Sequence, residues 1–291
     1  MNDTHAIDLR GVTCKLGKFQ LGPLNFAAPR GSVVAFIGPN GAGKTTTLDM
    51  LMGLGRPDDG EIRVLGLNQA ANEVWIKART AYVNPDMNFA AWGKVGRALN
   101  FIRGFYPDWD DARCERLLKA FELKRSDRIM TLSFGARIKL SLVMALARDA
   151  ELLLLDEPTV GLDVNARRIL FAEILDFIKR EDRTVVISSH QLADLERLAD
   201  HVAILNQGQL IAMGRMDELL DRYVQIDAEI AHDGAMPSLP GVRVLEREGG
   251  RVRLLIDTSL AGRADLAGFG VKEVAETPMT LEDLFVALVS E

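Results

Sequence analysis

A glycine-rich loop at residues 38–45, GPNGAGKT, lies between two segments that predict regular secondary structure. Before it, residues 33–37 form an apolar run, VVAFI, that is too short for a buried helix and rich in strand-forming side chains. After it, residues 45–54 are typical of a helix that ends near Gly53 and Gly55. Strand, glycine loop and helix in this order are the context that a phosphate-binding loop, or P-loop, requires.

The loop is predicted to hold the phosphates of a nucleotide, because it matches the pattern G-x-x-x-x-G-K-T in full. Its glycines let successive backbone N–H groups converge on an anion, and the start of the following helix adds the positive end of a dipole. Lys44 is expected to neutralise phosphate oxygens, and the Thr45 hydroxyl to ligate Mg²⁺. The predicted nucleotide-binding residues here are Gly38, Pro39, Asn40, Gly41, Ala42, Gly43, Lys44, Thr45 and Thr46.

A second apolar segment, residues 152–155, runs directly into two adjacent acids, Asp156 and Glu157. Two acids at the end of a buried strand are costly unless they face a cation or water at the carboxyl edge of the sheet. We therefore expect Asp156 to hold Mg²⁺, directly or through water, and Glu157 to polarise an attacking water.

Strand-like and helical segments alternate through this part of the chain, with a third apolar run at residues 184–190. Such alternation predicts a parallel sheet covered by helices. The pattern changes after about residue 223. Residues 242–256 are two strand-like runs around Gly249 and Gly250, which predict a hairpin. Near the end, Thr280 is a predicted N-cap with Asp283 three residues on.

Composition narrows the classes of function. The chain has 35 basic and 41 acidic side chains, and it contains no basic block, which argues against a nucleic-acid partner. Cys14 and Cys114 are far apart and are expected to be reduced thiols, with neither a disulfide nor a zinc site. No apolar stretch approaches the roughly 20 residues that span a bilayer, and no signal peptide is visible. These features predict a cytoplasmic protein.

Three further segments follow the P-loop in a diagnostic order. LSFGA at residues 132–136 precedes the LLLLDEP strand, GLD at residues 161–163 follows it, and His190 ends the third apolar run. Together they resemble the signature (LSGGQ), the D-loop and the switch histidine of the ATP-binding subunits of ATP-binding cassette (ABC) transporters. Phe134 and Ala136 differ from the family signature, which has glycine and glutamine there.

The resemblance covers roughly residues 5–220 and implies an α/β fold. It implies a P-loop NTPase core (an ABC ATPase) with a mostly parallel sheet, an antiparallel β subdomain and an α-helical subdomain at about residues 90–148. The ATP-binding domain then spans residues 1–223. Residues 224–291 are expected to form a small α+β accessory domain.

The resemblance also implies a mechanism that uses ATP and Mg²⁺. Two subunits would dimerise head to tail, with each ATP between one P-loop and the signature of the opposite subunit. Ser133 and the Gly135 N–H would contact the γ-phosphate across the interface, and Asp163 of the D-loop belongs to the same site. Glu157 would activate water, and His190 would sense the γ-phosphate. Because the signature keeps Ser133 and Gly135 but has Phe134 and Ala136, hydrolysis is expected to be intact but slow. Both a homodimer and a heterodimer with a second ABC ATPase remain open.

The partner implied by the resemblance is a separate transmembrane permease subunit, which exports a small molecule, lipid or peptide. The chain would then lie at the inner face of the membrane. FYPDWD at residues 105–110 and the C-terminal appendage look most like subunits of type-2 exporters. The alternative is a soluble ABC-type regulatory ATPase that acts on a protein partner without transport. A chromosome or repair ATPase is disfavoured because the separation of Thr45 and Leu132 is too short for a long coiled coil.

Two other positions depart from the family pattern. Leu16 stands where the family usually has an aromatic residue that stacks on adenine, and nearby Phe19 is the candidate replacement. The Q-loop glutamine is expected at about Pro85, so Asn84 or Asp86 is expected to take its role. Because a missing stack forfeits roughly 0.5–1.5 kcal/mol, we expect weak ATP affinity and poor discrimination against GTP.

Overall fold

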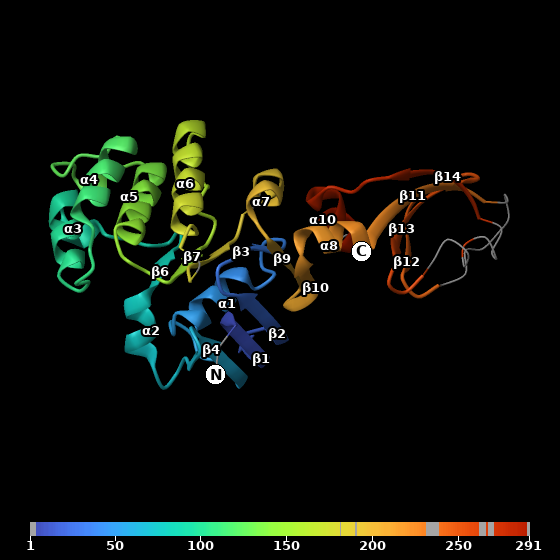
Figure 1. Cartoon of the computed structure of the whole chain (residues 1–291), viewed down its shortest axis with the longest axis horizontal. Coiled ribbons are helices and arrows are strands. Elements are labelled where there is room, and N and C mark those ends of the chain that lie inside the picture. Colours follow the sequence, from blue (N-terminus) through green and yellow to red (C-terminus); the bar gives the residue numbers. More distant parts are fainter. Residues whose placement is uncertain are drawn as a thin grey trace. The chain divides into compact units, whose positions relative to one another are not determined.

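The computed structural model divides the chain into two compact units, which are described separately (Figure 1). The first unit comprises Met1–His190 and Leu198–Ala212, and the second comprises Gln191–Arg197 and Met213–Glu291. Within them, the structure describes residues 4–180, 182–189, 191–230, 239–261, 266 and 271–289. Among these residues, none of the helices is both long enough and apolar enough to span a bilayer.

A six-stranded sheet forms the centre of the first unit, in the order β10-β9-β3-β8-β7-β6. Its strands are β3 (Val33–Ile37), β6 (Thr80–Val83), β7 (Leu152–Leu155), β8 (Thr184–Ile187), β9 (His201–Asn206) and β10 (Gln209–Arg215). Strands β6, β7, β8, β3 and β9 pair in parallel, and β3, β6, β7 and β8 are buried along their whole length. Continuous apolar runs suit strands that are covered on both faces. The predicted parallel sheet is confirmed.

A second, antiparallel sheet of the first unit has the order β2-β1-β4-β5. Its strands are β1 (His5–Leu16), β2 (Phe19–Pro29), β4 (Asp59–Val64) and β5 (Leu67–Asn68). Phe26 of β2 lies against Phe36 of β3, with ring centroids 5.5 Å apart and tilted planes, a favourable aromatic geometry. This contact joins the antiparallel sheet to the central sheet next to the P-loop.

Helices surround the central sheet, and α3, α4 and α5 lie together in Figure 1. The helices of this unit are α1 (Lys44–Leu51), α2 (Glu73–Arg79), α3 (Val95–Arg103), α4 (Asp111–Ala120), α5 (Phe134–Leu146) and α6 (Val164–Phe177), with 3₁₀ turns at Ala90–Trp92 and Ile129–Thr131. Asp110 caps α4 by accepting the Arg113 N–H at 2.8 Å, as its position in the sequence suggests. Arg113 also binds the buried Glu173 of α6 at 2.9 Å, which ties α4 to α6.

The second unit is built on an antiparallel sheet in the order β12-β13-β11-β14. Its elements are α7 (Leu192–Leu198, all but its last residue), α8 (Met216–Arg222), β11 (Tyr223–Glu229), β12 (Val242–Glu248), β13 (Arg251–Asp257), β14 (Lys272–Thr277) and α10 (Leu281–Val289). Strands β12 and β13 are the predicted hairpin. Thr280 and Asp283 cap α10 reciprocally, because each backbone N–H donates to the other side chain at 3.1 Å.

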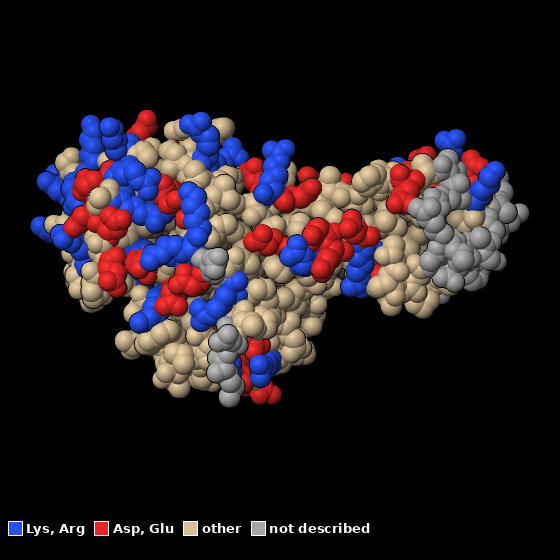
Figure 2. All heavy atoms as spheres, in the orientation of Figure 1, with Lys and Arg blue, Asp and Glu red and all other residues tan. Residues whose placement is uncertain are grey.

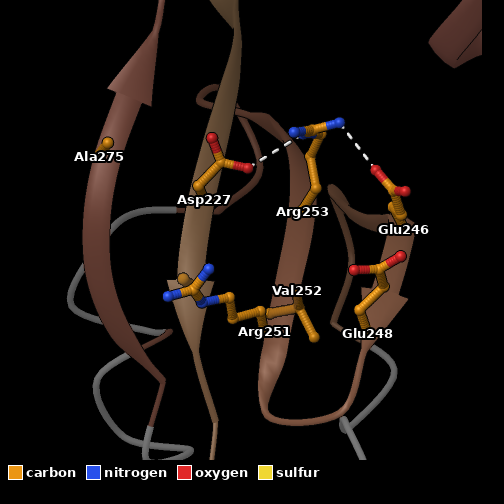
Figure 3. Close-up of a pocket in the computed structure, with 8 residues that line it drawn as sticks. Asp227, Glu246, Glu248, Arg251, Val252, Arg253 and Ala275 are labelled. Atoms are coloured by element: carbon orange, nitrogen blue, oxygen red, sulfur yellow. Dashed lines mark hydrogen bonds and ion pairs between the residues drawn. The ribbon is translucent and has the colours of Figure 1, made fainter.

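The two faces of this sheet differ in chemistry, as period-two alternation requires. One face packs the buried Ile226, Val252 and Leu254 into the core of the unit. The other face carries charges around a hollow of about 480 Å³ (Figure 3). There Arg253 donates to Asp227 at 3.0 Å and to Glu246 at 2.8 Å, so its charge is compensated on the sheet itself.

Candidate nucleotide-binding site

The P-loop adopts a conformation that its glycines make possible. Gly41 and Gly43 have φ of 79° and 105°, in the left-handed region where side chains with a Cβ are strained. Gly43 is the N-cap of α1, so the loop passes directly into the first helical turn. At Gly38 a Cβ would lie 2.5 Å from the Leu205 carbonyl oxygen, which leaves no space for a side chain.

Lys44 is buried, with 7% of its surface exposed, and its ammonium group is directed back at the loop. Nζ donates to the Gly38 carbonyl at 2.6 Å and to the Pro39 carbonyl at 3.3 Å, and it lies 3.9 Å from Oε1 of Glu157. Burial lowers the pKa of Lys44, while the carboxylates of Glu157 and Asp156 act against that shift. The loop therefore holds a cation whose carbonyl acceptors can be exchanged for phosphate oxygens.

Thr45 and Asp156 meet where α1 begins and β7 ends. The Thr45 hydroxyl donates to Oδ2 of Asp156 at 2.5 Å, and the Ser188 hydroxyl donates to Oδ1 at 2.6 Å. Parallel pairing of Leu155 with Ile187 brings Ser188 beside Asp156. A hydroxyl and a carboxylate side by side supply the hard oxygen ligands that Mg²⁺ prefers, so these residues fit the predicted metal.

Ser188 is a site residue that the sequence analysis missed. Its signal in the sequence was its position directly after an apolar strand, the same position that Asp156 has after β7. The carboxyl ends of neighbouring parallel strands meet at one edge of a sheet, where α/β proteins place their ligands. The backbone N–H of Glu157 donates to the Ser188 hydroxyl at 2.8 Å, so this serine orders both acids.

Glu157 has an unusual backbone conformation, with φ of 47°. Left-handed φ is uncommon for a residue other than glycine or asparagine, and such strain concentrates at functional sites. Here it directs a side chain that is only 13% exposed toward the Lys44 ammonium. The arrangement places a carboxylate beside the P-loop, where it can accept a proton from water next to a bound phosphate.

A cavity of about 390 Å³ joins these groups. Of the P-loop residues predicted to bind nucleotide, those from Pro39 to Thr46 line it, together with Asp156 and Glu157. Leu16 and Phe19 line it as well, and Leu16 is 54% exposed. The Phe19 ring reaches the P-loop, because its Cζ lies 3.2 Å from where a Cβ on Gly43 would be.

The signature and the D-loop contact each other away from this cavity. Ser133 caps α5 by accepting the Ala136 N–H at 3.2 Å, and Asp163 caps α6 and binds Lys139 at 2.8 Å. A Cβ on Gly135 would lie 2.1 Å from the Gly161 carbonyl oxygen, so the two segments touch through backbone. Among the described residues that line the P-loop cavity, Ser133, Gly135 and Asp163 do not occur. One chain therefore does not bring them to its own P-loop.

The segment after β6 forms a chain of hydrogen bonds with α1. Asn84 Nδ2 donates to the Tyr82 hydroxyl at 3.2 Å, and that hydroxyl donates to Asp49 Oδ1 at 2.9 Å. Asn84 Oδ1 accepts the Asp86 N–H at 2.9 Å, so both ends of the amide are engaged. Burial raises the pKa of both Asp49 and Tyr82. His190, the predicted γ-phosphate sensor, lies outside the described residues.

Comparisons with known proteins agree with this geometry. Residues 21–160 match the ABC transporter family. The chain is 30% identical over 299 residues to the Nod factor export ATP-binding protein I of Rhizobium johnstonii, covering 97% of this chain and 94% of the relative. It is 31% identical over 301 residues to the protein of the same name from Bradyrhizobium diazoefficiens, covering 97% and 96%.

Solved structures give the same result for the fold. A structure described as the ATP binding subunit of an ABC transporter superposes with a TM-score of 0.68 and 27% identity, covering 74% of this chain and 92% of that one. A dimeric ATP-binding cassette bound to ADP and Pi superposes with a TM-score of 0.64 over 72% of this chain and 98% of that one. At 21% identity, the second likeness concerns the fold alone.

The fold and the site define a P-loop ATPase of the ATP-binding cassette class. The chain belongs to the ABC transporter family and is an ATP-binding subunit with ATPase activity. The family resemblance and the fold class predicted from the sequence are thereby confirmed.

Proposed function

We propose that this chain hydrolyses Mg-ATP in a head-to-tail dimer and drives a separate membrane-spanning permease that exports a small molecule, lipid or peptide. One observation carries the proposal. Lys44, Thr45, Asp156 and Glu157 converge on one cavity, while the signature of the same chain does not line it. A second subunit that supplies its signature would complete the site only on closure, which couples hydrolysis to movement.

Each site residue has a proposed role. The P-loop N–H groups and Lys44 bind the phosphates, and Thr45 and Asp156 hold Mg²⁺. When bound, Mg²⁺ neutralises charge that develops on the phosphate oxygens during transfer. Glu157 accepts the proton of the attacking water, a contribution of about 10²–10⁴ in rate. His190 senses the γ-phosphate.

The opposite subunit contributes Ser133, Gly135 and Asp163. The Ser133 hydroxyl and the N–H groups at the start of α5 form a helix N-terminus, which favours an anion such as the γ-phosphate. This part of the proposal accommodates a homodimer and a heterodimer with a second ABC ATPase. Residues 1–223 are the proposed ATP-binding domain, with its helical subdomain at about residues 90–148, and residues 224–291 the accessory domain.

We propose that the permease docks in a groove of the first unit, named here the α3–α5 groove. It has a volume of about 330 Å³ and lies between the segment after β6 and helices α3 and α5. Its lining residues are Tyr82, Met87, Asn88, Phe89, Ile102, Tyr106, Ser141, Met144, Ala145 and Arg148. Docking there would hold the chain at the inner face of the membrane. The export role is supported by relatives named as export ATP-binding proteins.

The catalytic part is tested with Glu157→Gln. We expect the variant to bind Mg-ATP but to hydrolyse it about 10²–10⁴-fold more slowly, and therefore to accumulate as a dimer on size exclusion with Mg-ATP. Lys44→Ala is the control that should neither bind nucleotide nor dimerise. Undiminished hydrolysis by Glu157→Gln would contradict the assigned role, and an absent dimer would exclude self-pairing.

The transport part of the proposal is tested separately, by solubilising the membranes of the cells that naturally produce the protein in detergent and purifying the tagged chain from them. We expect one polytopic membrane protein to co-purify in stoichiometric amount and to stimulate the ATPase when both are reconstituted. Recovery of soluble partners alone would favour the alternative, an ABC-type regulatory ATPase without transport.

A further inference from the structure

Arg148, one of the residues that line the α3–α5 groove, is held in place without an acidic partner. Its Nη2 donates to the backbone carbonyls of Lys77 at 2.9 Å and Thr80 at 3.0 Å. Its guanidinium lies 3.6 Å above the centre of the Tyr106 ring. In the described part of the chain it forms no ion pair, and its buried Nε has no hydrogen-bond acceptor. The charge is therefore fixed in position but not compensated.

This situation is unusual, because Arg148 is half-buried and charges drawn away from water are normally paired. Burial lowers the pKa of Arg148 to about 10, because the charged form loses part of its hydration. Basic side chains of the first unit are elsewhere interspersed with acidic ones on the face seen in Figure 2. The half-buried Arg113 and the buried Arg183, for example, bind Glu173 and Asp149 respectively.

The nearest acids in the sequence are already engaged. Asp149 binds Arg183 and also Arg180, at 2.7 Å from the latter. Glu151 binds Arg79 at 3.0 Å and lies 3.6 Å from Arg30. Neither acid lines the α3–α5 groove. No acid is among the described residues that line the groove, so a carboxylate that meets Arg148 from the groove side would belong to another molecule.

The groove itself specifies the chemistry of that molecule. Among the described residues that line it, Arg148 is the one charged side chain, and Met87, Phe89, Ile102 and Met144 provide apolar walls. A complementary segment would present apolar side chains to these walls and one carboxylate to the guanidinium. Arginine suits this role, because its guanidinium can donate to a carboxylate through Nη1 while Nη2 stays bound to the backbone carbonyls.

We infer that Arg148 recognises an Asp or Glu side chain on a cytoplasmic segment of the permease, and so selects the membrane subunit that docks in the α3–α5 groove. This inference rests on the proposed function, which supplies a permease as occupant. The three backbone carbonyls of Lys77, Ala78 and Thr80 and the Tyr106 ring orient the guanidinium before the partner arrives. Binding therefore orders few additional groups, which favours affinity.

The experiment uses the full chain and the polytopic subunit that co-purifies with it, reconstituted in nanodiscs, with affinity measured by biolayer interferometry. We expect Arg148→Gln and Arg148→Glu to weaken binding by about 30-fold or more, as truncation of a buried charge pair does. Arg180→Gln, a surface arginine outside the groove, should change it less than about threefold. Thermal midpoints verify that each variant is folded, and Arg148→Lys, which keeps the charge, should bind better than Arg148→Gln.

Charge reversal identifies the partner residue. Each Asp and Glu in the cytoplasmic segments of the permease is changed to Arg in turn and paired with Arg148→Glu, and one of these changes should restore binding. Equal binding of wild type and the Arg148 variants, or failure of every reversal, would overturn the inference while the proposed function stands. A wild-type chain that binds no polytopic protein would overturn both. Binding of a second copy of this chain at the groove would replace the permease as occupant.

Discussion

The hydroxyl of Thr45 donates to Oδ2 of Asp156 across 2.5 Å, which joins the first turn of α1 to the residue that follows β7. The second carboxylate oxygen accepts from Ser188 at 2.6 Å. Both oxygens of Asp156 are therefore oriented by neighbouring hydroxyls. Preorganisation of this kind spares the cost of ordering the ligands when the metal arrives.

Replacing Ser188 tests this orientation without removing a metal ligand. We expect Ser188→Ala to reduce Mg-dependent ATP hydrolysis by about 10–100-fold and to raise the Mg²⁺ concentration that gives half-maximal rate, because residues that orient metal ligands have effects of this size. Steady-state ATPase assays over a Mg²⁺ titration measure both quantities. Ser32→Ala is the matched control, because Ser32 is also buried but donates to the Pro29 carbonyl before β3. An unchanged Mg²⁺ dependence in Ser188→Ala would contradict the assignment.

The contact between Gly135 and Gly161 predicts that a side chain at Gly135 impairs stability and hydrolysis but not the binding of ATP to the P-loop. A Cβ at Gly135 would lie 2.1 Å from the Gly161 carbonyl oxygen, so Gly135→Ala must displace the D-loop from the start of α5. We expect the free energy of unfolding to fall by about 1–3 kcal/mol and Mg-ATP hydrolysis to fall at least about tenfold. Binding of ATP to the P-loop should stay within about threefold, since Gly135 does not line that cavity.

Urea titration, ATPase assays and equilibrium binding of a fluorescent ATP analogue separate these effects. Gly55→Ala is the control, because a Cβ there would meet Met50 at 3.5 Å, an ordinary van der Waals distance. A Gly135→Ala protein with normal stability and normal hydrolysis would show that the two segments can separate at no cost.

Much of the fold was predictable because short apolar runs were bounded by clear signals. The strands at Val33–Ile37 and Leu152–Leu155 end at a glycine loop and at two acids, and the hairpin of the second unit turns at Gly249. Each of these signals lies within a few consecutive residues. The cap formed by Thr280 and Asp283 is local in the same way.

What sequence analysis missed depends on which strands lie side by side. Ser188 reaches Asp156 only because β8 pairs with β7 in register. The order of strands in a sheet cannot be predicted from a short segment of sequence. The link from Tyr82 to Asp49 likewise joins β6 to α1 across the fold. The exchange of the Q-loop glutamine for Asn84 or Asp86 stays a prediction, and in this structure the Asn84 amide is engaged by its neighbours.

Leu16 occupies the side of the P-loop cavity where the adenine base is expected, so an aromatic residue introduced there should change the affinity for ATP. Leu16 lines the cavity and is 54% exposed, so an aromatic ring there would have space to stack on adenine. We expect wild type to bind ATP and GTP with similar affinity, and Leu16→Trp to bind ATP about 2–10-fold more tightly, equivalent to roughly 0.5–1.5 kcal/mol. Competition against a fluorescent nucleotide analogue measures both affinities.

Leu54→Trp is the matched control for this substitution, because Leu54 is also an exposed leucine, at 62%, but does not line the cavity. Phe19→Ala should weaken ATP binding if the Phe19 ring has taken over the missing contact. Strict preference for ATP in the wild type, or no effect of Leu16→Trp, would contradict the assignment of this side of the cavity to the base.

The second unit is predicted to lose stability in acid through a single ion pair. Arg222 binds both oxygens of Asp257 at 2.8 and 2.6 Å, and this interaction, with a hydrogen bond from Ser259, lowers the pKa of Asp257 to about 2. The carboxylate therefore stabilises the folded state above about pH 4, and the contribution disappears as the pH falls toward 2. Because Arg222 is 42% exposed, we expect about 1–2 kcal/mol. The test is urea unfolding at pH 6 and pH 2.5. Asp257→Asn should lower the free energy of unfolding by this amount at pH 6 and by much less at pH 2.5. Asp221→Asn is the control, because Asp221 is exposed on α8 and its replacement should have little effect at either pH. An equal cost of Asp257→Asn at both values would show that packing, rather than the charge, holds the strand end.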